Sequence, residues 1–87
     1  MDITSIIIRK VFTETKRLLA TVDIVIDNNL LIKNIRLFDN GTKMFVEFPS
    51  SSRDPAYPDI IPLNEKTRQY IENEIITEYQ QNIKEVS

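Results

Sequence analysis

The side chains that could do chemistry in this chain are polar and basic groups in a serine-rich loop and at the start of the helix expected after it. The loop covers residues 50–58 and contains no large aliphatic residue. Hydroxyl, guanidinium and ammonium groups donate hydrogen bonds to phosphate oxygens, and the free N–H groups of a helix N-terminus favour an anion. The candidates for binding a nucleic-acid backbone are Arg53, Arg68, Lys66, Ser51 and Ser52.

A structural role explains the same residues. Arg68 can pair with Glu65 or Glu72 on the helix, and the serines can simply end a strand. Residue by residue this structural interpretation is slightly favoured, so the residues alone leave both interpretations open.

Basic residues on the expected strands could form a second, shallower platform for a nucleic acid. Such residues are more often solvated positions that discourage edge-to-edge aggregation, and we favour that interpretation for most of them. They are Arg9, Lys10, Lys33, Arg36 and Lys43. Among the aromatic residues, only Tyr57 in the loop is expected to be exposed and able to stack a base. Packing explains the others, including Phe45 and Phe48.

Catalysis is not expected. The chain has no histidine and no cysteine, so an active site would need carboxylates, a lysine or a serine. The sequence shows no nucleophile beside a base, no glycine-rich phosphate loop and no spacing typical of metal ligands. Turn and solvent-exposed roles account for the carboxylates Asp23, Asp27, Asp39, Glu47 and Asp59. We therefore expect that the protein is not an enzyme and that it uses no metal, cofactor or small-molecule substrate.

Length and charge restrict the remaining possibilities. Eighty-seven residues predict one domain, 1–87, and so small a core favours stabilisation by self-association. The net charge of −2 argues mildly against nucleic-acid binding, but it is unevenly distributed. Residues 1–53 hold eight Lys/Arg and six Asp/Glu (+2), whereas residues 54–87 hold three and seven (−4). The absence of a basic leader or a long apolar run predicts a cytoplasmic protein without membrane contact.

The alternation of apolar residues predicts strands at 3–12, 18–26, 30–38 and 44–48, joined by short turns at 27–29 and 39–41. Asn40-Gly41 favours a type I′ hairpin turn. A short edge strand is expected at 59–62, and a helix from the N-cap Asn64 to about residue 83. The fold class is therefore α+β, an antiparallel meander of four to five strands with one long C-terminal helix over it.

The expected strands carry more apolar side chains than one buried face of the sheet requires. Even-numbered residues from Leu18 to Ile26 are expected in the core, and odd-numbered ones mostly in water. On the first strand, Ile7 and Val11 are expected to share a face beside Arg9. With Leu31 they form an apolar surface that a partner would cover.

The chain resembles the SpoVG family of bacterial septation and sporulation regulators over nearly its whole length. None of the matching motifs is specific by itself, but the order and spacing of all of them together are specific. The matches are Ile6-x-Ile8-Arg9, 24–28, Ile35-Arg36-Leu37, Phe45-Val46-x-Phe48-Pro49-Ser50, Asp59-Ile60, Pro62-Leu63-Asn64, Thr67-Arg68 and 73–79.

This resemblance implies a DNA- or RNA-binding regulator of septation, sporulation or related gene expression, acting as a homodimer joined through its strands. It places binding in the loop after Pro49-Ser50 and at the helix start, and it adds Arg36 to the candidates. It also assigns Ile7, Val11 and Leu31 to the dimer interface. Typical members carry Lys-Arg where this chain has Ser51 and Ser52. The alternative is a dimeric protein–protein adaptor of the same fold without nucleic-acid binding.

Overall fold

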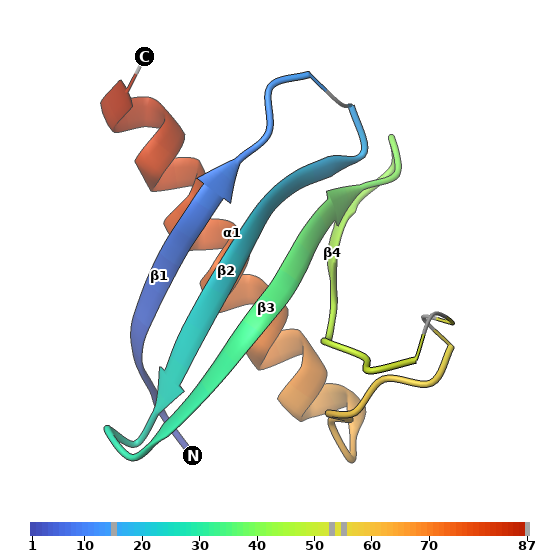
Figure 1. Cartoon of the computed structure of the whole chain (residues 1–87). Helices are drawn as coiled ribbons and strands as arrows, with labels where there is room; N and C mark the ends of the chain where they lie inside the picture. The colour runs from blue at the N-terminus through green and yellow to red at the C-terminus, as the bar shows by residue number, and fades with distance from the viewer. Residues whose placement is uncertain (15, 53, 55, 87) are drawn as a thin grey trace.

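The described residues form one antiparallel sheet of four strands and one long helix. The computed structural model describes residues 1–14, 16–52, 54 and 56–86, with side chains described through residue 83. Strands adjacent in the sequence are adjacent in the sheet (Figure 1), which confirms the predicted meander and the α+β class. The elements are β1 (Ile3–Val11), β2 (Leu18–Ile26), β3 (Leu30–Asp39), β4 (Met44–Glu47) and α1 (Glu65–Val86).

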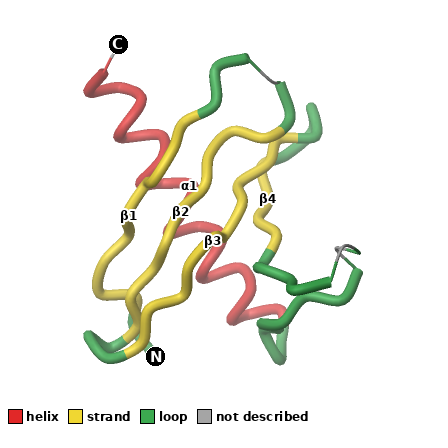
Figure 2. Tube along the Cα trace, in the orientation of Figure 1, coloured by secondary structure: helices red, strands yellow, loops and turns green. Residues whose placement is uncertain are grey.

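The hydrophobic core lies between the sheet and α1. Figure 2 shows α1 running diagonally behind the sheet, with no other described element over the near face. Three helix residues spaced four apart, Ile71, Ile75 and Tyr79, form the buried apolar stripe of the helix. The sheet contributes the other buried apolar side chains, which are Ala20, Val22, Ile24, Ile26, Ile32, Ile35, Leu37 and Val46, with Phe48 just beyond β4.

Irregularities in strand pairing move two residues from their predicted faces. The register between β2 and β3 shifts between Leu18 and Ala20. Leu19 therefore packs against the core, whereas Leu18 lies opposite Phe38 on the other face, so the predicted core position of Leu18 is wrong. A bulge inserts one extra residue into a ladder and reverses the alternation after it.

The same effect separates Val11 from Ile7. The β1–β2 register shifts between Ile8 and Lys10. Ile7 lies opposite Asp23, but Val11 lies opposite the core residue Ala20. The prediction that Ile7 and Val11 share a face is wrong, because it assumed unbroken alternation.

Two connections differ in how their turns form. Asp27 and Asn28 have φ values of 52° and 57°, and the Asn29 N–H donates to the Ile26 carbonyl at 2.9 Å, as a type I′ turn requires. In the next turn only Gly41 has positive φ, at 92°. The type I′ prediction is therefore wrong there, since the Asn40 side-chain oxygen instead accepts hydrogen bonds from the two N–H groups that follow Gly41.

Residues 59–62 form no strand, contrary to the expectation of a short fifth one. Pro58, just before this segment, and Pro62, its last residue, lack N–H donors, which limits ladder formation. The Asp59 N–H still donates to the Pro49 carbonyl at 2.9 Å, so the segment lies beside the end of β4 without joining the sheet.

The start of α1 is capped as predicted. Asn64 Oδ1 accepts a hydrogen bond from the Thr67 N–H at 2.8 Å, and the Asn64 carbonyl accepts from the Arg68 N–H at 3.2 Å. No helix among the described residues is long and apolar enough to cross a membrane.

Replacing Asn64 with alanine should lower the free energy of unfolding by about 1 kcal/mol, because the cap bond to Thr67 is lost. In a domain of this size, that corresponds to roughly 4–8 °C in Tm. Thermal unfolding followed by circular dichroism measures the effect. Asn64→Asp is the matched control and should keep most of the stability; an unchanged Tm in Asn64→Ala would contradict the capping role.

Candidate nucleic-acid interface

The face of the sheet turned away from α1, here called the outer face, carries a row of polar side chains across all four strands. Lys10 lies opposite Thr21, Thr21 opposite Arg36, and Arg36 opposite Glu47. The row is thus basic over β1 and β3 and acidic on β4. The outer face comprises Ser5, Ile7, Lys10, Leu18, Thr21, Asp23, Val25, Leu31, Arg36, Phe38, Phe45 and Glu47.

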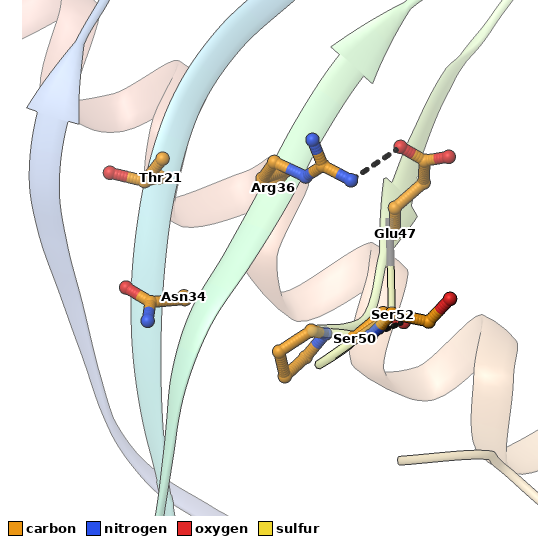
Figure 3. A pocket seen from close by; sticks show the side chains of 7 residues that line it. Thr21, Asn34, Arg36, Glu47, Ser50 and Ser52 are labelled. Carbon is orange, nitrogen blue, oxygen red and sulfur yellow. Dashed lines mark hydrogen bonds and ion pairs between the residues drawn. The ribbon is translucent and has the colours of Figure 1, made fainter. Parts of the chain in front are cut away.

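A pocket of about 540 Å³ opens on this face (Figure 3). Its walls come from three strands and from the residues that follow β4. Arg36 Nη2 lies 3.4 Å from Glu47 Oε2, and the Arg36 side chain is 43% exposed. An ion pair this accessible to water holds its partners weakly, so the guanidinium can exchange Glu47 for a phosphate. The lining residues are Thr21, Asn34, Arg36, Glu47, Pro49, Ser50 and Ser52.

Asp23 is a buried carboxylate beneath the outer face, which makes its predicted solvent-exposed role wrong. Only 1% of the residue is exposed. Arg9 Nε donates to Asp23 Oδ2 at 2.7 Å, and the Asn34 N–H donates to Asp23 Oδ1 at 3.0 Å. Both donors lie where strand pairing is irregular, and Asn34 has a φ of 63°. One carboxylate therefore holds both bulges in place.

The protonation of Asp23 follows from these contacts. Burial raises the pKa of its carboxyl, but hydrogen bonds from Arg9 and Asn34 and the charges of Arg9 and Lys33 outweigh burial, leaving the pKa below its ordinary value of 3.8. Asp23 is therefore ionised at neutral pH and offsets part of the positive charge of Arg9.

Arg68 contacts the free edge of β4. Its Nη2 donates to the Val46 carbonyl at 3.2 Å, while Glu72 Oε2 accepts from the Val46 N–H at 3.1 Å. Arg68 and Glu72 also form an ion pair at 3.8 Å, one of the two pairings weighed from the sequence. We call this arrangement of Arg68, Glu72 and the Val46 backbone the Val46 clamp.

The serine hydroxyls hold the loop after β4 together. Ser51 donates from its N–H and its Oγ to the Asp59 carboxylate, at 2.8 and 3.1 Å. Ser50 Oγ donates to the Tyr57 carbonyl at 2.7 Å, and Ser52 Oγ accepts from the N–H two residues later at 3.1 Å. The carboxylate beside Ser51 makes that hydroxyl a poor place for a phosphate.

The residues predicted to form one nucleic-acid site therefore lie in separate parts of the structure. Arg36 and Ser52 line the outer-face pocket, whereas Arg68 lies at the β4 edge and Lys66 is exposed at the start of α1. Arg53 lies outside the described residues.

The three residues predicted for a dimer interface also lie on different faces of the sheet. Leu31, 47% exposed, lies opposite Val25 on the outer face, and Ile7 is on the same face. We call Ile7, Val25 and Leu31 the outer apolar patch. Val11 is not part of it, because the β1 bulge turns it toward the face that α1 covers.

Sequence reasoning missed two aromatic residues on the outer face. Phe38 and Phe45 lie directly opposite each other, with ring centroids 5.6 Å apart and planes 16° from parallel. Each is next in sequence to a fully buried residue, Leu37 or Val46. The alternation that puts those residues in the core was therefore the signal that puts the rings outside it.

Comparison with known proteins gives consistent results over nearly the whole chain. The SpoVG family model matches residues 1–81. A protein of Agathobacter rectalis is 38% identical over 88 residues, covering 99% of this chain and all of that relative. A protein of Bacillus cytotoxicus is 35% identical over 81 residues, covering 91% of this chain and 82% of that relative. Both carry the name "Putative septation protein SpoVG". The chain belongs to the SpoVG family.

Proposed function

We propose that this protein binds nucleic acid through the outer face of its sheet and acts in the cytoplasm as a homodimeric, non-catalytic regulator of septation, sporulation or related gene expression. The role in septation comes from the name of the relatives. The binding surface comes from the charge of the outer face.

The observation that carries this proposal is the separation of charge between the two layers. Lys10 and Arg36 lie in one row of the outer face with a single acidic residue, Glu47, and the nearby Asp23 is buried under Arg9. In contrast, α1 holds five glutamates and three basic residues. A phosphate backbone is attracted to the sheet side and repelled by the helix side.

A second candidate, the dimeric adaptor, is favoured by the outer apolar patch. Leu31 is half exposed and lies beside Val25 on a face that no other described element covers. A second copy could bury this patch, and so could a different protein.

Binding of labelled DNA and RNA of mixed sequence, measured by fluorescence anisotropy at low and moderate salt, tests the proposal. We expect salt-sensitive binding that Arg36→Ala weakens, with a salt slope smaller by about 1 because one phosphate contact is lost. Lys66→Ala is the matched control, since it removes one exposed charge from the helix side and should have less effect.

Two outcomes would contradict the proposal. Absence of binding at low salt would leave the adaptor as the better candidate. A larger loss in Lys66→Ala than in Arg36→Ala would move the binding surface to the helix start. Sedimentation at several concentrations tests the dimer separately.

A further inference from the structure

We infer that the nucleic acid this face recognises is single-stranded, with an unpaired base stacked on the Phe38–Phe45 pair and the backbone held by Lys10 and Arg36. This inference rests on the proposed function, because it specifies the form of nucleic acid that the outer face binds.

The two phenylalanines are placed for contact with a ligand rather than for core packing. They project from β3 and β4 on the outer face, while their neighbours Leu37 and Val46 are completely buried on the other face. Both rings remain partly accessible. The two rings stack on each other, with planes 16° apart, and form an aromatic surface whose end a base can extend.

The polar row of the outer face lies next to this aromatic surface. Arg36 is two residues from Phe38 along β3, and Glu47 is two residues from Phe45 along β4. Two strand residues span roughly 7 Å, a distance that one nucleotide can bridge between its base and its phosphate. The Arg36 guanidinium carbon lies over the Phe38 ring, 5.5 Å from its centroid, so the cation that would hold a phosphate is in contact with the aromatic pair.

The pocket beside Arg36 offers polar groups for the edge of a base. Asn34 and Thr21 line it together with Ser52, and amide and hydroxyl groups both donate and accept hydrogen bonds. Its volume of about 540 Å³ lies within the range of roughly 300–1,000 Å³ typical of small-molecule sites. A flipped-out base therefore has room there.

A duplex could not use these features. Its bases are paired and stacked on one another, so aromatic rings on a broad sheet reach only its phosphates. Unpaired bases expose their faces, and aromatic side chains beside basic ones are the usual means of holding them. The aromatic surface thus adds affinity only for single strands.

The test compares one sequence as single strand and as duplex, in DNA and in RNA, with the full chain at fixed salt. We expect tighter binding of the single strand. Phe38→Leu and Phe45→Leu should each weaken it by roughly 5- to 150-fold, the range for loss of one stacked base, and should leave duplex affinity and the salt slope unchanged. Tyr57→Leu, which removes an exposed aromatic ring from the loop, is the matched control and should have little effect.

Two further measurements separate stacking from a loss of structure. The chain has no tryptophan, so Phe45→Trp introduces a single indole whose fluorescence should be quenched by a single strand but not by duplex. A strand of the same length without bases cannot stack, so its affinity for the wild type should equal its affinity for the Phe45→Leu variant, and both should be low.

The possible outcomes distinguish base stacking from the proposed nucleic-acid binding on which it rests. If duplex binds as tightly as single strand, or if Arg36→Ala weakens binding while both leucine variants do not, stacking is wrong and the nucleic-acid function stands. If neither form binds at low salt, both are wrong.

Discussion

Replacing Asp23 with asparagine should lower the free energy of unfolding by about 2 kcal/mol, because hydrogen bonds to a charged group contribute roughly 1.5–3 kcal/mol. The amide cannot replace the carboxylate, since its N–H₂ group would face one of the two donors, the Arg9 guanidinium or the Asn34 N–H. Both the Arg9 and the Asn34 bulge depend on this side chain. Urea denaturation at neutral pH and fixed protein concentration measures the effect.

Arg9→Ala is the control and should cost less, about 1 kcal/mol or below. The Arg9 side chain is 54% exposed, so its removal lets water reach the carboxylate. A larger loss in Arg9→Ala than in Asp23→Asn would show that the pair is not organised around the buried carboxylate.

The effect of Asp23 should also depend on pH. The folded-state pKa lies below the ordinary value of 3.8, so the stabilisation is complete above that value and is lost as the pH falls through the folded pKa. The stability difference between the wild type and Asp23→Asn should therefore shrink below pH 3.8. A difference that stays constant into the acid range would contradict the ionised state.

Replacing Ile75 with alanine should cost about 2–5 kcal/mol, because the side chain is completely buried and its loss leaves a cavity. This is a large share of the stability that a small domain possesses. Circular dichroism should therefore show a protein that is partly unfolded at ambient temperature, or one with a strongly lowered Tm.

Ile83→Ala provides the matched control on the same helix. Ile83 is 40% exposed, and the gain in helix propensity is the same for both substitutions, so the difference between them isolates burial. Ile75→Val, expected to cost about 0.5–1.5 kcal/mol, covers the case in which the alanine variant does not fold. Equal losses at positions 75 and 83 would contradict the assigned helix face.

The sequence predicted the order of elements well because each is marked locally. Alternation marks the strands, Asn64 marks the helix start, and the Ile71–Ile75–Tyr79 spacing marks the buried helix face. The failures occur where one residue is added to a ladder. A bulge leaves no trace in an alternating pattern, so Val11 and Leu18 were assigned to the wrong faces.

The candidate site was harder to predict because its parts are distant in sequence. Lys10, Thr21, Arg36 and Glu47 come from four strands, and only strand register brings them into one row. Asp23 looked like an ordinary exposed carboxylate because nothing local shows that Arg9 and Asn34 meet it. The loop serines looked available because their partner Asp59 comes eight residues after Ser51.

The Val46 clamp limits how large an assembly built by strand addition can become. It gives the outward N–H and carbonyl of Val46 to the chain's own helix, so a strand of another molecule cannot pair there without displacing Arg68 and Glu72. Among the described residues, no side chain caps the backbone of β1 in this way between Ser5 and Val11. Two copies joined edge to edge at β1 would each use their one open edge. The joined sheet would then end at both sides in a β4 strand whose Val46 backbone is already bonded. Growth would therefore stop at a pair, whereas a sheet with two open edges can extend into a fibre.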